Sequence, residues 1–188
     1  MTSFDTDALT LGDVVTTGKG AKQANICGLK GEAVAATLDV MQVAFAPSAY
    51  NDPEATRVSI VFRPSEAVLE QLGKVDDWIV TSVAENATKF FGKPKGFDAV
   101  KEMYQPIVRP SEKYGPSIKA KLNISGPGEI RCWDEHRSMR DQPQEWKGAS
   151  VKPRLWLRSL YFMGGSFGAT LECTDVQILS EASAECPF

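Results

Sequence analysis

The sequence predicts a mainly β fold of the α+β class, a five-stranded barrel or sandwich with one long inserted helix and one short appended helix. Segments in which apolar and polar residues alternate, as they do in half-buried strands, lie near both ends of the chain. One long helical stripe of apolar residues separates them. So few helices could not cover both faces of a parallel sheet, which argues against an alternating βαβ arrangement.

Length and composition favour one domain. The chain has 188 residues, of which 43% are apolar, and this is enough for one substantial core. Residues 1–32 are rich in Thr, Gly, Asp and Lys and are expected to form an N-terminal arm or an edge strand. Residues 33–179 form the predicted barrel domain, and residues 180–188 are expected to be a flexible acidic C-terminal tail.

Two strands are expected before the helix, one within residues 33–45 and one over Arg57–Phe62. The helix is expected to begin at Ser65, a good N-cap residue. Trp78 is interpreted as an anchor that faces the core. The apolar stripe, at spacings of three and four residues, consists of Val68, Leu72, Val75, Ile79 and Val83.

The segments after the long helix are expected to be a short amphipathic helix over residues 98–103 and then mainly strands. Met163–Gly168 predicts a hairpin turn with glycines at positive φ, rather than a phosphate-binding loop. The final strand covers residues 169–179, and its alternation changes phase at Asp175, which indicates a β-bulge.

Residues 151–158 form the most informative segment. Its odd positions are Val, Pro, Leu and Leu, whereas its even positions are Lys152, Arg154, Trp156 and Arg158. Because side chains alternate between the two faces of a strand, one face is apolar and the other is cationic and aromatic. Three cations around an indole suit a polyanion whose bases can stack. The structural alternative is a solvated outer face with a tryptophan folded over it.

Two other segments repeat this pattern. In Ile118–Ile124 lysines occupy the polar positions, and in Ile130–Trp133 an arginine and a tryptophan share one face. If the three strands belong to one sheet, their polar faces form one nucleic-acid-binding surface. The residues of that surface would be Lys119, Lys121, Arg131, Trp133, Lys152, Arg154, Trp156 and Arg158.

Charge is segregated along the chain, although the net charge is only -3. Residues 88–162 hold 15 Lys or Arg against 8 Asp or Glu, and the remainder holds 6 against 16. A basic middle and an acidic end permit a polyanion ligand that the overall charge would argue against.

Several classes of function are disfavoured by missing motifs. The chain has one histidine, His136, and four dispersed cysteines without zinc-site spacing, so we expect no metal and no cofactor. No phosphate-binding glycine motif, nucleophile elbow or HExxH sequence indicates an enzyme. No secretory or membrane-spanning apolar run is present, which favours an intracellular protein with free thiols and no membrane partner.

Four segments carry a family resemblance: Phe90–Lys93, Tyr104–Pro106, Ile118–Leu122 and Phe162–Gly168. In their order and spacing, the chain resembles the OB-fold single-stranded DNA-binding proteins of short-tailed phages and of giant DNA viruses of algae and protists. In such proteins an early strand pair precedes a long helix, a Phe-Gly-Lys connector and a Tyr-x-Pro element. Strands with lysines and aromatic residues then lead to a glycine-rich turn and an acidic tail. The similarity covers residues 33–188.

The resemblance implies a non-enzymatic OB-like barrel that coats single-stranded DNA during replication, recombination or repair, without sequence preference. Lys93 of the connector joins the expected binding residues, and Tyr104, Tyr114 and Trp146 are secondary stacking candidates. If the protein is viral, it would act in the cytoplasm or nucleus of an infected host cell. A homodimer is the assembly considered besides a monomer.

The end of the chain resembles the acidic, phenylalanine-ended tails that dock replication and recombination enzymes in such proteins. The tail residues concerned are Glu181, Glu185, Pro187 and Phe188. Carboxylates can also compete for a cationic surface, but this tail has only two in its last eight residues, which favours partner docking over self-inhibition. A frayed terminus with an incidental phenylalanine is the alternative.

Two other classes of function stay open at this point. A β-sandwich component of a virion or another assembly would show the same alternation, with its basic stripe against an acidic neighbour and no bound nucleic acid. An enzyme is suggested only by the cluster Asp134, Glu135 and His136. These three residues lie in a charged segment that is expected to be a solvated loop, so we do not interpret them as a catalytic site.

Overall fold

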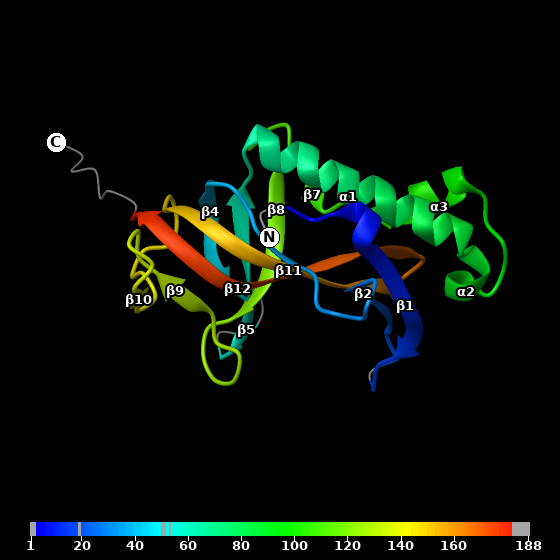
Figure 1. Ribbon diagram of the computed structural model, residues 1–188, viewed down its shortest axis with the longest axis horizontal. Helices are drawn as coiled ribbons and strands as arrows, with labels where there is room; N and C mark the ends of the chain where they lie inside the picture. The colour runs from blue at the N-terminus through cyan, green and yellow to red at the C-terminus, as the bar shows by residue number, and fades with distance from the viewer. Residues whose placement is uncertain (1–2, 19, 50–51, 53, 182–188) are drawn as a thin grey trace.

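The computed structural model describes residues 3–18, 20–49, 52 and 54–181 (Figure 1). The helices of this part of the chain are η1 (Thr6–Ala8), α1 (Glu66–Glu85), α2 (Ala87–Phe91) and α3 (Phe97–Met103). The strands are β1 (Leu9–Thr16), β2 (Lys22–Gly28), β3 (Ala35–Thr37), β4 (Met41–Ser48), β5 (Arg57–Arg63), β6 (Tyr104–Gln105), β7 (Val108–Arg109), β8 (Ser117–Asn123), β9 (Arg131–Trp133), β10 (Met139–Arg140), β11 (Ser150–Met163) and β12 (Ser166–Ser180).

Five strands close into a barrel. β4 pairs with β5, β5 with β8, β8 with β12 and β12 with β11, and β11 returns to pair with β4. The β8–β12 pairing is parallel and the other four are antiparallel. A closed ring of strands encloses one core and removes the edges of the sheet. The predicted mainly β, five-stranded OB-like barrel is therefore confirmed.

The long helix lies where the sequence predicts it, across one side of the barrel (Figure 1). All five residues of the predicted stripe are buried, and Trp78 packs partly buried against the same core. Ser65 is the N-cap residue, but its side chain makes no capping hydrogen bond. Helix α3 matches the predicted short helix to within one residue.

The basic, aromatic connector after α1 contains a second short helix, α2, which the periodicity did not predict because it has only five residues. Phe90 and Phe91 of α2 contact Phe162 of β11 at ring-centroid distances of 5.6 and 5.9 Å. Phe162 in turn stacks on Phe167 of β12 at 5.6 Å. This aromatic cluster fixes the helical connector to the tip of the β11–β12 hairpin.

The tip itself is the predicted turn. Gly164 and Gly165 have φ of 60° and 83° and join the paired residues Met163 and Ser166. A two-residue turn with both residues at positive φ matches the twist of a β-hairpin, and glycine adopts this conformation without steric cost.

The N-terminal segment forms a β-hairpin of β1 and β2, and β2 extends the sheet by pairing with the end of β11. Its buried residues Phe4, Leu9, Ala24 and Ile26 belong to the common core. Residues 1–32 were expected to be an arm or an edge strand, and this hairpin is where the structure places their described part.

Residues 33–45 form two strands rather than one. β3 and β4 are separated at residues 38–40, where the Asp39 side chain accepts a hydrogen bond from the Val40 backbone N–H at 2.8 Å. Such a local bond competes with strand pairing. Val40, predicted to lie inside a strand, is 38% exposed.

The change of phase predicted at Asp175 is a β-bulge. Arg154 of β11 pairs with Asp175, but the next residue, Leu155, pairs with Cys173, so Thr174 is the extra residue. Before the bulge odd-numbered residues of β12 face the core, and after it even-numbered residues do. The bulge therefore places Glu172 and Asp175 on the same outward face, although they are three residues apart.

Deleting Thr174 should destabilise the fold, because loss of the extra residue turns either Glu172 or Asp175 toward the core. A buried carboxylate without its partner costs about 3–5 kcal/mol. The control Thr174→Ala keeps the bulge and loses one hydrogen bond, of 3.0 Å, to the Asp175 carboxylate, which should cost about 1 kcal/mol. Urea denaturation measures the free energy of unfolding of both variants. Equal stability of the two would contradict this role of the bulge.

Candidate nucleic-acid interface

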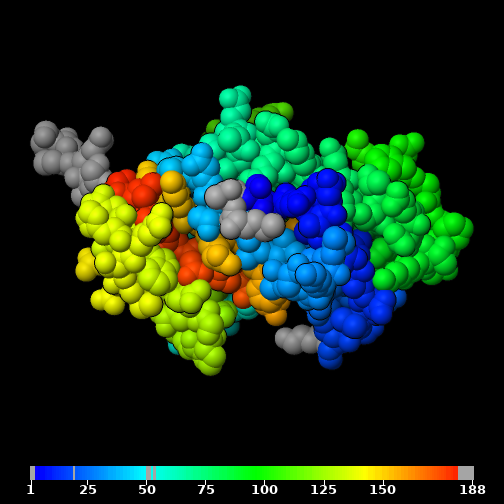
Figure 2. Space-filling model, viewed as in Figure 1, coloured from blue at the N-terminus to red at the C-terminus, as the bar shows by residue number. Residues whose placement is uncertain are grey.

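The strands bring most of the predicted binding residues onto one outward surface, here called the polar face. β12 runs through its middle, with β11 on one side and β8 and β9 on the other. Figure 2 shows part of β12 (red) at the surface between the β9–β10 segment (yellow) and N-terminal segments (blue). Across the strands the paired residues form three rows: Lys152–Gln177–Trp133, Arg154–Asp175–Arg131 and Trp156–Glu172–Lys121–Ser59.

The alternation that predicted this surface is present in each strand. Val151, Pro153, Leu155 and Leu157 of β11 are buried, and the even-numbered residues between them face outward. In β8, Lys119 is exposed and Lys121 is partly exposed, with buried apolar residues on the inner side. The eight residues of the predicted surface therefore share one sheet.

Lys93, the ninth predicted binding residue, is not part of the polar face. It is exposed in the connector between α2 and α3, and Figure 1 shows these helices at the opposite end of the molecule from β9. The aromatic cluster around Phe162 holds the connector there.

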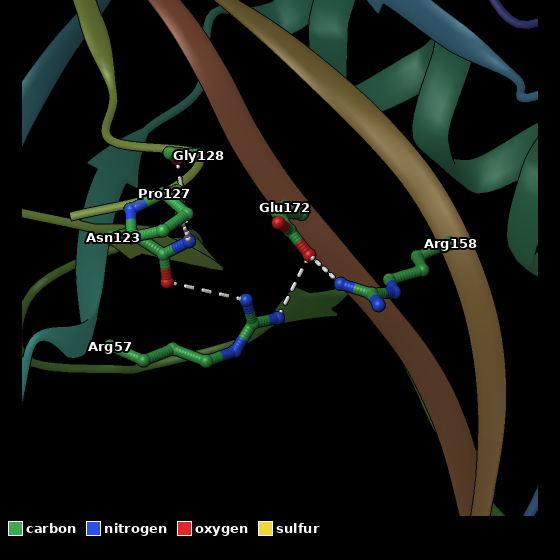
Figure 3. Close-up of polar contacts among 6 residues, drawn as sticks. All are labelled: Arg57, Asn123, Pro127, Gly128, Arg158 and Glu172. Carbon is green, nitrogen blue, oxygen red and sulfur yellow. Dashed lines mark hydrogen bonds and ion pairs between the residues drawn. The ribbon is translucent and has the colours of Figure 1, made fainter.

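Glu172 lies at the centre of the polar face and binds two arginines (Figure 3). Its Oε2 accepts hydrogen bonds from Arg57 Nη2 at 2.8 Å and from Arg158 Nη1. Arg57 Nη1 also donates to Asn123 Oδ1 at 3.5 Å. Partial burial would raise the pKa of Glu172, but the hydrogen bonds and charges of the two arginines outweigh it and lower that pKa.

Asp175 forms a second centre. Its carboxylate accepts a two-pronged interaction from Arg131, from Nε at 2.8 Å and Nη2 at 2.9 Å, and a bond from Trp133 Nε1 at 3.1 Å. Asp175 is only 9% exposed, and burial alone would raise its pKa, but the hydrogen bonds from Arg131, Thr174 and Trp133 outweigh this and lower it. Asp175 thus fixes both the guanidinium and the indole.

These two carboxylates change the charge distribution predicted for the surface. Arg57, Arg131 and Arg158 are neutralised by Glu172 or Asp175. Within the described part of the chain, no carboxylate lies within 4.0 Å of the charged groups of the remaining four cations, Lys119, Lys121, Lys152 and Arg154. The polar face therefore has a net positive charge, and its free cations lie around the two carboxylates.

Both indoles of the polar face are partly exposed. The guanidinium of Arg158 lies over the Trp156 ring at 5.0 Å from its centroid, a cation–π contact. Trp156 Nε1 is buried without a hydrogen-bond partner among the described residues. Trp133 is held through its Nε1 by Asp175. Each ring is thus in contact with a charged group of the polar face and stays partly exposed, and Arg158 covers one face of the Trp156 ring.

Two of the secondary stacking candidates are structural. Trp146 is only 7% exposed and belongs to the core, so it cannot stack on a base as predicted from the sequence. Tyr104 is also 7% exposed, and its hydroxyl donates to Asp76 Oδ1 of α1 at 2.5 Å. Burial raises the pKa of Tyr104, and burial likewise raises that of Asp76. Tyr114 is exposed, in the turn between β7 and β8.

Phe45 of β4 is an exposed aromatic residue on the outer side of the barrel that the alternation did not reveal. It pairs with Val61, which pairs with Lys119, and its side chain is 55% exposed. Met41 and Val43 are buried, so regular alternation along β4 predicts that Phe45 is buried as well. A register shift between Val43 and Phe45 reverses its direction.

Asp134, Glu135 and His136 form a turn rather than a catalytic cluster. Asp134 Oδ1 accepts the backbone N–H groups of His136 at 2.9 Å and Ser138 at 2.8 Å, which satisfies the turn between β9 and β10. Glu135 and His136 are exposed. Among the described residues, no group of three or more His, Cys, Asp or Glu could hold a metal ion, and no helix is long and apolar enough to span a membrane.

The chain leaves the barrel beside β10. Glu181, the last described residue, is exposed and forms an ion pair with Arg140 of β10. Glu185, Pro187 and Phe188, the other residues assigned to a docking tail, lie outside the described residues.

No protein-family model and no curated protein matches the sequence. Solved structures do share the fold. The crystal structure of gp2.5, a single-stranded DNA-binding protein encoded by bacteriophage T7, matches with a TM-score of 0.51 and 15% sequence identity, over 80% of this chain and 88% of that one.

The single-stranded DNA-binding protein from bacteriophage Enc34 also shares the fold. Its complex with single-stranded DNA matches with a TM-score of 0.50 and 10% identity, over 92% of this chain and 96% of that one. Another structure of the Enc34 protein matches with a TM-score of 0.51 and 11% sequence identity, over 95% of this chain and 96% of that one. At these identities the likeness establishes the fold, which is that of phage single-stranded DNA-binding proteins.

The ion pairs of Glu172 and Asp175 should make stability sensitive to acid. Because both folded-state pKa values are lowered, their contribution is fully present above the ordinary values of 4.5 and 3.8 and is lost as pH falls through the lowered values. A Glu172→Gln/Asp175→Asn variant should therefore be less stable than the wild type at pH 7, and the difference should shrink by pH 3.

Urea denaturation at the two pH values measures this difference. Glu70→Gln is the matched control, because the ion pair of Glu70 with Lys74 is exposed and should contribute little. A stability difference that is the same at pH 7 and pH 3 would show that the carboxylates do not act through these ion pairs.

Proposed function

We propose that the protein binds single-stranded DNA on the polar face, without sequence preference and without catalysing a reaction. The observation that carries this proposal is the coincidence, on one outward surface, of two partly exposed indoles, Trp133 and Trp156, and four cations that form no ion pair with any described carboxylate. The likeness of the fold to the phage single-stranded DNA-binding proteins supports it.

Affinity would come mainly from the backbone phosphates. The unpaired lysines and Arg154 neutralise phosphates and release counterions, so that affinity falls as salt rises. The paired arginines contribute differently, because a phosphate oxygen can accept their remaining N–H groups while Glu172 and Asp175 hold them in place.

Preference for single strands would come from the indoles. Both rings lie within a sheet between charged neighbours, and only an unpaired base can offer its face to them. Stacking contributes about 1–3 kcal/mol per base and depends little on sequence, because every base has a π-face.

In the cell, the proposed role is to coat strands exposed during DNA replication, recombination or repair. The resemblance of the sequence to proteins of phages and giant DNA viruses suggests an infected host cell as the setting. We further propose that the tail with Glu181, Glu185, Pro187 and Phe188 docks replication or recombination enzymes, because carboxylates and an aromatic ring suit a basic, apolar pocket on a partner.

Replacing Trp156 with alanine tests the proposed function. The variant should lose at least about tenfold in affinity for oligo-dT, in line with the stacking contribution of one base. Because the ring is partly exposed, the thermal midpoint should stay nearly unchanged. Titration by fluorescence anisotropy measures affinity, and Trp78→Phe on α1 is the control that should bind as the wild type does. A folded Trp156→Ala protein with unchanged affinity would show that the polar face is not the binding surface.

Removing residues 182–188 tests the tail. Since the cationic polar face stays intact, affinity for oligo-dT should be unchanged or slightly higher, whereas stimulation of a cognate DNA polymerase on coated template should disappear. Phe188→Ala in the full chain is the matched variant and should show the same loss of stimulation. A marked fall in DNA affinity after truncation would mean that the tail is part of the binding surface.

A further inference from the structure

A groove opens where β8 and β12 separate. The two strands are neighbours at Lys121 and Glu172. Toward their N-terminal ends the segment of residues 104–109 lies between them, because β6 pairs with β12 and β7 pairs with β8. The groove above this segment has a volume of about 370 Å³. We call it the side groove.

Three cations line the side groove: Arg109, Lys119 and Lys121. None of them has a carboxylate within 4.0 Å in the described residues, in contrast to the arginines at the centre of the polar face. Partial burial lowers the pKa of Lys121, and the charges of Lys119 and Arg57 lower it further. Three positive charges thus lie together here, none in an ion pair with a described carboxylate, and a bound anion would reduce their mutual repulsion.

The same groove offers an aromatic ring and an apolar floor. Tyr161 of β11 lines it together with Ile107 and Leu171. The Tyr161 side chain lies across Gly168 of β12, where a Cβ atom would come within 2.7 Å of the tyrosine Oη and 3.0 Å of the Gln105 carbonyl oxygen. Glycine at position 168 therefore makes room for the ring.

The side groove continues the polar face. Lys121, at its inner end, is paired with Glu172 in the same row as Trp156. A volume of about 370 Å³ is at the lower end of the range of about 300–1,000 Å³ typical of ligand pockets, which suits one nucleotide and not a duplex.

We propose that the side groove is a terminal subsite for one nucleotide of the bound strand, with its phosphate on Arg109, Lys119 and Lys121 and its base against Tyr161. This subsite rests on the proposed function, and it adds residues that the alternation of the three basic strands does not identify. It also means that the bound DNA strand runs from Trp133 and Trp156 across β12 into the side groove.

A length series of oligo-dT tests the subsite. Some oligonucleotides are long enough to reach the indoles but too short to reach the side groove. Arg109→Gln and Tyr161→Leu should each bind these with the same affinity as the wild type. They should lose about five- to tenfold for oligonucleotides long enough to reach the groove. For Arg109→Gln, the salt slope for these longer oligonucleotides should also fall by about 0.7, the value for one lost phosphate contact on a single strand. Lys113→Gln, an exposed change in the neighbouring turn, is the control and should match the wild type throughout.

Photocrosslinking gives a second readout that does not depend on the stability of the variants. Oligo-dT with 4-thiothymidine at either the 5′ or the 3′ end should crosslink from one end to residues 104–109 or 161–163. If the variants bind all lengths as the wild type does and neither end crosslinks to these residues, the subsite is wrong although DNA binding stands. If the wild type binds no oligonucleotide of any length, the proposed function itself fails.

Discussion

The polar face depends on one constraint, the bulge at Thr174 in β12. β12 is bordered by β11 on one side and by β6, β8 and β9 on the other, so its inward side chains complete the core of the barrel. A regular strand would turn either Glu172 or Asp175 inward. With one extra residue both carboxylates point outward, where Glu172 binds Arg57 and Arg158 and Asp175 binds Arg131. The bulge thus allows one strand to serve the core and to organise the surface.

This arrangement gives the surface order as well as charge. A surface of lysines and arginines alone would repel itself and leave long side chains mobile. Glu172 and Asp175 hold three arginines and the Trp133 indole in fixed positions, at the cost of part of the positive charge. The free charge then lies at the ends of the rows and in the side groove. A strand of DNA would meet a prepared surface and lose less conformational entropy in ordering it.

Periodicity in the sequence predicted the parts of the fold that are set locally. Alternation identified the outward residues of β8, β9 and β11 and the bulge at Asp175, and spacings of three and four residues identified the buried stripe of α1. Each of these features depends only on residues close together in the chain. Alternation could not predict that Arg131 and Arg158 are neutralised, since their carboxylates lie on a different strand.

Other residues were misplaced because their surroundings depend on irregularities or on distant segments. The direction of Phe45 is reversed by a register shift in β4. Trp146 was assigned to the surface because its neighbours are polar, yet long-range packing buries it. Tyr161 and Gly168 acquire their role only when β6 lies beside β12.

The most direct measurement is a titration of the wild-type protein with oligo-dT and with duplex DNA at two salt concentrations, followed by tryptophan emission. Single strands should quench the emission and bind more tightly than the duplex, and their affinity should fall with salt with a slope of about 0.7 for each phosphate contacted. Emission that does not respond to single strands, or an equal response to both forms of DNA, would contradict the account.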